Sequence, residues 1–263
     1  YNVGVGFNAG YSVTTGINNT LIGGLAGDAL TDADYNTVLG FNALSADTLG
    51  SRAVAIGFEA LNDQNFTSAT DSYNIAIGFN AGCKVTTGVR NTLIGSKTGD
   101  AFTDADYNVA LGYNALTSDT LGSTSTAIGY AALETQNFTS ATDSYNTAVG
   151  YNAGTAVTTG TNNTLIGGLA GDAITTGADN VVVGYTAFGA NTTGASNVAL
   201  GAFALDANTT ASNNTAVGTS SLGANTTGAG NTGIGRVALL ANTTGADNVA
   251  LGYRALNANT TAS

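Results

Sequence analysis

The chain has 263 residues, including 37 Gly but no Pro, His, Met or Trp, and a formal net charge of −11. Its 43% share of hydrophobic residues is too high for a disordered linker, and no stretch approaches the run of about 18 apolar residues that a membrane span needs. Six Lys and Arg residues cannot form a basic patch, which argues against nucleic acid or a membrane surface as a partner. The single Cys83 excludes an internal disulfide and a cysteine zinc cluster.

One short phrase repeats along the whole chain. It ends in Gly, and taking that Gly as position zero gives fifteen copies, at Gly6, Gly23, Gly40, Gly57, Gly78, Gly95, Gly112, Gly129, Gly150, Gly167, Gly184, Gly201, Gly218, Gly235 and Gly252. Successive copies are 17 residues apart, except for two spacings of 21. This period predicts a single repeat domain over residues 1–263, divided into the blocks 1–72, 73–144 and 145–263.

The three residues before each zero Gly predict a β-strand, first at residues 3–5 and then in every later unit. Position −1 is always Val, Ile or Leu, and position −3 is always Thr, Val or Ile. This alternation and these residue types are typical of a strand, and the invariance of position −1 predicts that it faces the core. Position +3 is Ala in thirteen units, which predicts close packing there, and with Ala, Val, Leu or Gly at position −2 it predicts that neighbouring chains approach closely in a homotrimer. Position +1 varies from Phe7 to Arg236, so we expect it at a rim or a subunit contact.

A unit of 17 residues cannot bury its own apolar face, but stacked units can pair each strand with its copies. The predicted fold is therefore all-β, a parallel β-solenoid with fifteen coils of 17 or 21 residues. Position −4 is Asn in thirteen units. Stacked Asn side chains could form an amide ladder, or each Asn could instead favour the turn at its own corner. Fifteen whole units without a polar cap also predict a segment of a longer fibre.

The phrases "NNTAVG" at 213–218, "NNTLIG" at 18–23 and "YNTAVG" at 145–150 resemble the head repeats of YadA-type trimeric autotransporter adhesins. The longer phrase "NTAVGYxALxANTTG" is similar to repeats of phage tail fibres and bacterial surface fibres that mature with an intramolecular chaperone. The resemblance implies a left-handed β-roll, a side-by-side homotrimer and an extracellular place on a virion or cell surface. The adhesin heads have a shorter unit than this chain.

Each of the two 21-residue units carries four extra residues, within Gln64 to Ser68 and Gln136 to Ser140. Protruding loops on a rigid scaffold often bind partners. We expect the two Phe residues to be exposed anchors of a binding patch formed by Asn65, Phe66, Thr67, Asn137, Phe138 and Thr139. Alternatively, the insertions only relieve packing or twist between blocks.

Without His, the chain cannot form a Ser-His-Asp triad or a Cys-His pair, so we expect no enzymatic activity. The copied segments "GDALTDADY" and "GDAFTDADY" place paired carboxylates on one strand face. With backbone carbonyls, these could hold Ca²⁺, and no other cofactor is expected. The candidate ligands, whose alternative role is a solvated acidic corner, are Asp32, Asp34, Asp104 and Asp106.

Together these features predict a structural shaft or adhesin segment of a phage tail fibre or bacterial surface fibre, which mediates attachment to a host or surface. Its expected partners are further copies of itself and a cell-surface receptor or glycan. One alternative is a self-assembling extracellular filament. Another is a monomeric ice- or ligand-binding solenoid, for which the later "NTT" rows, such as Asn191 to Thr193, would present outward Asn and Thr side chains.

Overall fold

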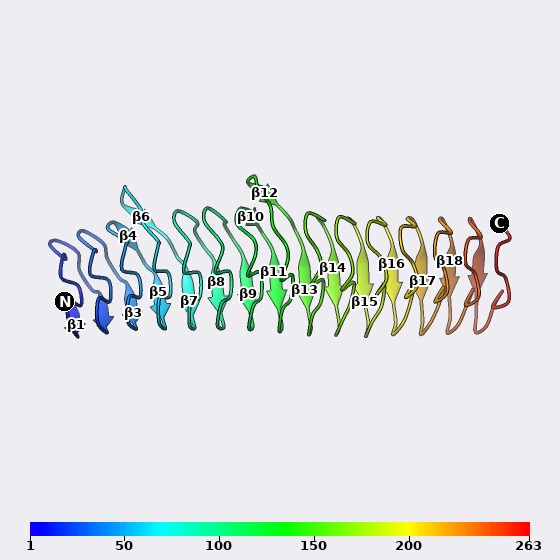
Figure 1. The fold of residues 1–263 in the computed structure, drawn as a ribbon, viewed down its shortest axis with the longest axis horizontal. Helices are drawn as coiled ribbons and strands as arrows, with labels where there is room; N and C mark the ends of the chain where they lie inside the picture. The colour runs from blue at the N-terminus through cyan, green and yellow to red at the C-terminus, as the bar shows by residue number, and fades with distance from the viewer. The chain divides into compact units, whose positions relative to one another are not determined.

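The computed structural model describes residues 1–263 and confirms an all-β parallel solenoid of about fifteen turns without a helix (Figure 1). Its residues form two compact units. Unit 1 comprises Tyr1–Ile128 with Asn137–Asp143, and unit 2 comprises Gly129–Gln136 with Ser144–Ser263. No helix is long and apolar enough to cross a membrane.

In unit 1 each turn contributes one three-residue strand to a parallel sheet, and the strands are β1 (Val3–Val5), β2 (Thr20–Ile22), β3 (Thr37–Leu39), β5 (Val54–Ile56), β7 (Ile75–Ile77), β8 (Thr92–Ile94), β9 (Val109–Leu111) and β11 (Thr126–Ile128). Neighbouring turns are in strict register, with Val3 opposite Thr20. The register also holds across the first insertion, where Val54 is opposite Ile75. The insertion therefore leaves the sheet undisturbed.

Unit 2 repeats the arrangement, and its strands are β13 (Thr147–Val149), β14 (Thr164–Ile166), β15 (Val181–Val183), β16 (Val198–Leu200), β17 (Thr215–Val217), β18 (Thr232–Ile234) and β19 (Val249–Leu251). All pair in parallel, for example Thr164 with Val181. The sequence period thus becomes a spatial period, because residues 17 apart lie one above another.

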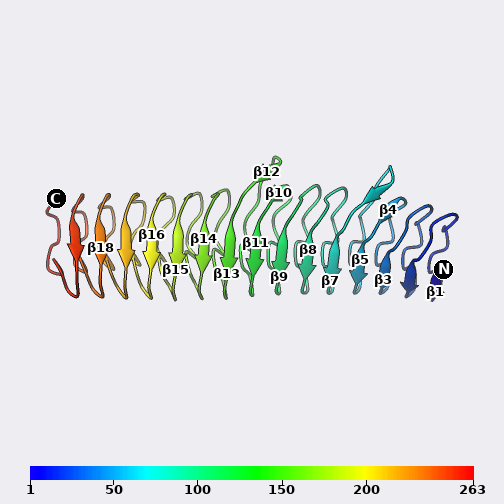
Figure 2. The same cartoon turned by 180° about the vertical axis from the view of Figure 1, so that it is seen from behind.

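The two insertions form the remaining strands, and both belong to unit 1. β4 (Gly50–Ser51) pairs with β6 (Thr70–Asp71), and β10 (Gly122–Ser123) pairs with β12 (Thr142–Asp143). Figures 1 and 2 show that β6 and β12 extend beyond the loops of the neighbouring turns. Each insertion is therefore a protruding arm held to the turn before it.

Position zero must be Gly for two reasons: its backbone φ is positive, and the backbone of the next turn leaves no room for a side chain. Gly167 has a φ of +134°, and a Cβ built there would lie 2.5 Å from the carbonyl oxygen of Gly184. No side chain fits in that space, and non-glycine residues rarely adopt this φ. This explains why position zero is Gly in all fifteen units.

The prediction that position −1 faces the core is wrong, because position −2 faces the interior and positions −1 and −3 face outward. Within β3, Val38 at position −2 is fully buried, whereas Leu39 at position −1 is 46% exposed. The interior is narrow, so its −2 column carries Ala in many turns and is never larger than Leu. The Ala column at +3 is buried as predicted, with Ala26 and Ala43 fully enclosed.

Each turn fills its interior in one of two complementary ways. In six turns position +4 is Gly and position +7 is apolar, as in Gly27 with Leu30. A Cβ at Gly27 would lie only 2.8 Å from Cδ1 of Leu30, so the two positions share one space. In the other nine turns position +4 is Leu or Phe and position +7 is Asp, Gln or Asn, as in Leu44 with Asp47. Positions +4 and +7 together therefore supply one large apolar side chain per turn, in addition to the residue at position −2.

The Asn column at −4 is an inward ladder that joins successive turns. The backbone N–H of Asn36 donates to Oδ1 of Asn19 over 2.9 Å, and Nδ2 of Asn19 donates to the carbonyl of Ala33 over 2.7 Å. The same pattern recurs in unit 2, where the N–H of Asn180 donates to Oδ1 of Asn163. Of the two roles open from the sequence, the structure shows the ladder, and it satisfies amides that are fully buried.

Candidate functional site

The strongest candidate for a functional surface is the outward sheet face, defined as positions −3, −1 and +1 of all turns. Its central columns carry only aliphatic or β-branched side chains, although they point away from the interior. Val109 is 39% exposed in unit 1, and Val183 is 36% exposed in unit 2. Within each unit, a surface of aliphatic and Thr side chains that recurs at every turn is a candidate site of association.

Aromatic rings at position +1 form one margin of the outward sheet face. In unit 1, Phe58 stacks between Phe41 and Phe79, with ring centroids 5.8 and 5.3 Å apart. In unit 2, Tyr130 stacks on Tyr151 at 5.3 Å. All five rings remain exposed, which agrees with the expected rim. Their position adds a rigid, apolar edge to the aliphatic columns.

The other margin of the face in unit 1 is position −5, where Tyr and Arg alternate from Tyr35 to Tyr107. Arg52 lies 4.8 Å from the ring centroid of Tyr35 and pairs with Asp71 over 2.9 Å. Arg90 lies 5.3 Å from the ring centroid of Tyr107 and donates from Nη1 to its hydroxyl over 2.9 Å. Charged groups are thus kept to the margin, while Tyr and Arg, which are enriched in protein interfaces, surround an apolar centre.

The expectation that Phe66 and Phe138 are exposed anchors is wrong. They are 5% and 6% exposed, because each ring folds back over the turn before it. Cδ2 of Phe66 would lie 2.7 Å from a Cβ at Gly50, and Phe138 covers Gly122 in the same way. The insertions therefore bury their aromatic residues, and the predicted positions that remain exposed are Asn65, Thr67, Asn137 and Thr139.

A buried carboxylate holds the base of each insertion. Oδ1 of Asp47 accepts from the N–H of Gly50 and of Phe66 over 3.0 and 3.2 Å, and Oδ2 accepts from Nε2 of Gln64 over 2.6 Å. Burial raises the pKa of Asp47, against the lowering effect of these hydrogen bonds. Asp119 repeats the role by accepting from the N–H of Phe138 over 3.1 Å. Sequence analysis missed this pair, although an Asp precedes each insertion at an otherwise core position.

The four candidate calcium ligands each accept a hydrogen bond from the preceding turn. Oδ1 of Asp32 accepts from the hydroxyl of Thr15 over 2.6 Å, and Oδ1 of Asp34 accepts from the N–H of Ile17 over 2.7 Å. Asp104 and Asp106 repeat both bonds in their own turn, each over 2.7 Å. No group of three or more Asp, Glu, His or Cys side chains comes together in a way that could hold a metal. These carboxylates connect neighbouring turns.

The "NTT" rows do not present the two outward side chains expected of them. Asn191 is fully buried in the +7 column, and of its row only the second Thr, Thr193, is exposed. Cys83 is half-buried, and its Sγ lies 3.5 Å from the carbonyl oxygen of Asp100. Burial, reinforced by the nearby carboxylates, raises its pKa to about 11, so the thiol is unreactive at neutral pH.

No protein-family model matches the chain, and a comparison with curated proteins finds no match. Its function is therefore inferred from the geometry of the chain itself.

Proposed function

We propose that the chain is a structural segment of an extracellular fibre, and that its outward sheet face packs against identical chains in a side-by-side homotrimer. The observation that carries this proposal is the −1 column, which is Val, Ile or Leu in all fifteen turns although it faces outward. A column that faced only water could carry polar residues, whereas contact with a partner at every turn would restrict it to aliphatic residues.

The geometry of the solenoid suits this kind of association. Because the turns are stacked in strict register, a contact made in one turn recurs in the next, and small gains of about 25 cal/mol per Å² of buried apolar surface accumulate along the unit. The small side chains at +3 and −2 do not contribute, because they are buried inside their own turn. The contact instead comes from the aliphatic columns and their aromatic margin.

In this proposal the fibre belongs to a phage tail or a bacterial surface, and it mediates attachment to a host or surface. The insertions are the parts best placed to meet a receptor or glycan, because they extend from the stacked turns and expose amides and hydroxyls, as at Asn65 and Thr67. We propose no catalytic role, since the chain lacks His and its paired Asp carboxylates already accept hydrogen bonds between turns.

Sedimentation tests the association. The wild-type chain should sediment at three times the chain mass of 25.9 kDa at micromolar concentration. Leu39→Asp combined with Val183→Asp places charges on the outward sheet face and should yield folded monomers. Thr193→Asp, at an exposed position outside that face, is the matched control and should remain trimeric. A wild-type chain that sediments as a stable monomer would refute the proposed trimer.

Attachment is tested separately on the insertions. Replacing Asn65, Thr67, Asn137 and Thr139 with Ala removes exposed polar groups and leaves the buried Phe residues in place. Host-cell binding of the purified fibre should fall, with an unchanged circular dichroism spectrum. Full binding by this variant would show that the insertions are spacers.

A further inference from the structure

The start of the first insertion, residues 63–67, alternates between exposed and buried side chains. Asp63, Asn65 and Thr67 are exposed, whereas Gln64 and Phe66 between them are buried. A carboxylate, an amide and a hydroxyl therefore follow one another on the accessible side of the arm.

The three exposed side chains match the acceptor sequence of a covalent modification. Asn-X-Thr is the sequence at which transferases attach a sugar to the side-chain nitrogen of Asn. One class of these transferases also requires a carboxylate two residues before the Asn, and Asp63 supplies it here. A carboxylate at that place can pair with a cationic group of the enzyme.

Contacts with the preceding turn orient the amide of Asn65. The hydroxyl of Thr48 donates to Oδ1 of Asn65 over 3.2 Å and shares its hydrogen with the carbonyl of Phe66 over 3.0 Å. The N–H of Phe66 is held by Asp47. The nitrogen Nδ2 of Asn65, to which the sugar would be attached, makes no hydrogen bond within the chain.

Asn137 offers a comparison in which only the carboxylate is missing. It occupies the same exposed place in the second insertion, and its Oδ1 accepts from the hydroxyl of Thr120 over 3.1 Å. Thr139 is exposed like its counterpart in the first insertion, but the residue two positions before the Asn is Thr135.

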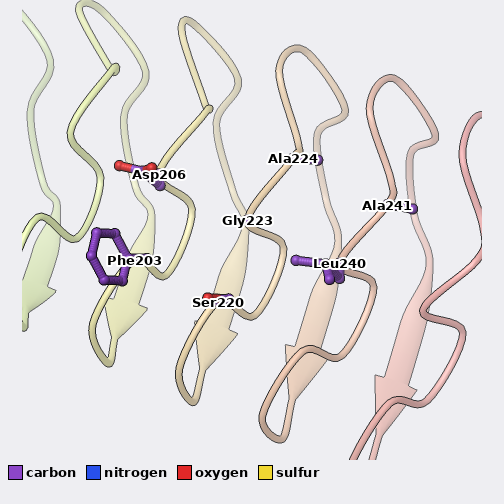
Figure 3. Close-up of a pocket in the computed structure, with 7 residues that line it drawn as sticks. All are labelled: Phe203, Asp206, Ser220, Gly223, Ala224, Leu240 and Ala241. Atoms are coloured by element: carbon purple, nitrogen blue, oxygen red, sulfur yellow. The ribbon is translucent and has the colours of Figure 1, made fainter.

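Asn208 offers the opposite comparison, since it has the carboxylate but lacks exposure. Asp206 precedes it by two residues and lies beside a surface hollow of about 440 Å³ in unit 2 (Figure 3). Asn208 itself is fully buried, and its Oδ1 and Nδ2 are bonded to the N–H and the carbonyl of Ala211 over 3.0 and 3.1 Å. Of the Asn-X-Thr sequences in the chain, only Asn65 therefore combines a preceding carboxylate with an exposed amide.

We propose that Asn65 is a site of N-glycosylation by a transferase that recognises Asp63. Nδ2 of Asn65 attacks the anomeric carbon of a sugar that is carried on a lipid-linked diphosphate. The new carbon–nitrogen bond forms as the bond from that carbon to the diphosphate oxygen breaks. The lipid diphosphate leaves with the electron pair, and the amide proton passes to a base of the transferase. Asn65 does not belong to the outward sheet face, so this modification is separate from the proposed association.

The test uses the purified folded chain, an oligosaccharyltransferase that requires a carboxylate two residues before the Asn, and its lipid-linked oligosaccharide. Intact mass and glycopeptide mass spectrometry should find one added oligosaccharide, at Asn65. Asn65→Gln should abolish the addition, and Asp63→Asn should slow it about tenfold or more, because the charge is lost while the shape is kept. An unmodified wild-type chain, or an unchanged rate in Asp63→Asn, would overturn the proposal.

Two matched controls separate the sequence from its exposure. Thr135→Asp completes the pattern at Asn137 and should add a second oligosaccharide, and the fold should accept this change because Asp63 occupies the same position of the first insertion. Asn208 should stay unmodified in the folded chain but be modified in a peptide of residues 204–212. Equal modification of Asn137 in the wild type, or of Asn208 in the folded chain, would contradict the proposal. Because no host cells are used, the result does not depend on whether the insertions bind a receptor.

Discussion

Two neighbouring residues of β14 give a direct test of which strand face is the core. Leu165 is fully buried, whereas Ile166 is 38% exposed on the outward sheet face. Cδ2 of Leu165 reaches within 2.9 Å of a Cβ position at Gly171, and the paired register of Thr164 with Val181 fixes the spacing of the turns. The site therefore has little freedom to collapse when the side chain is shortened.

Leu165→Ala should lower the free energy of unfolding by about 3 to 5 kcal/mol, the upper part of the range for buried Leu, because a cavity remains. Ile166→Ala removes three carbons that are little more than half covered, which at about 0.8 kcal/mol per buried methylene is roughly 1 to 1.5 kcal/mol. The measurement is urea unfolding followed by circular dichroism, at two protein concentrations to separate association from folding. If Ile166→Ala costs as much as Leu165→Ala in the dissociated chain, the assignment of faces is refuted.

Three further predictions concern single residues. Because burial raises the pKa of Asp47 above 3.8 in the folded chain, folding favours its protonated form, and the stability of the wild type relative to Asp47→Asn should rise as the pH falls from 7 towards 4 in urea titrations. Iodoacetamide should label Cys83 about 100-fold more slowly in the folded than in the unfolded chain at pH 8, as measured by mass spectrometry. Gly167→Ala should cost about 3 kcal/mol in thermal unfolding, whereas Gly168→Ala, whose Cβ position is 3.6 Å from its nearest neighbour, should cost less than about 1 kcal/mol.

The solenoid architecture could be predicted because the repeat period is visible in the sequence. A Gly every 17 residues with alternating β-branched residues before it fixes the number of turns and the place of each strand. The parallel pairing follows, since residues such as Val3 and Thr20 occupy equivalent positions in adjacent turns. The Asn column pointed to stacking, but only the hydrogen bond from Asn36 to Asn19 distinguishes a ladder from a row of turn residues.

The facing of the strands could not be predicted by invariance alone. An interior one residue wide tolerates Ala55 in one turn and Leu21 in another, because positions +4 and +7 adjust to fill the remaining space. Position −1 faces outward but is always aliphatic, so its sequence pattern is more typical of a core than that of position −2, which is buried. The insertions misled for a related reason. The inserted residues do protrude from the stacked turns. The apolar ring of Phe66, however, packs against Gly50 of the preceding turn and is therefore buried.

The Asn ladder has a consequence for how the chain folds. Oδ1 of Asn19 receives its donor from the next turn and never from a distant part of the chain. Strand partners are likewise 17 or 21 residues apart. Contacts at that separation amount to about 0.07 of the chain length, a relative contact order normally found in helical bundles rather than in β proteins. Each completed turn can serve as a template for the next, so this all-β chain could fold in the order in which a ribosome delivers it, without waiting for its far end.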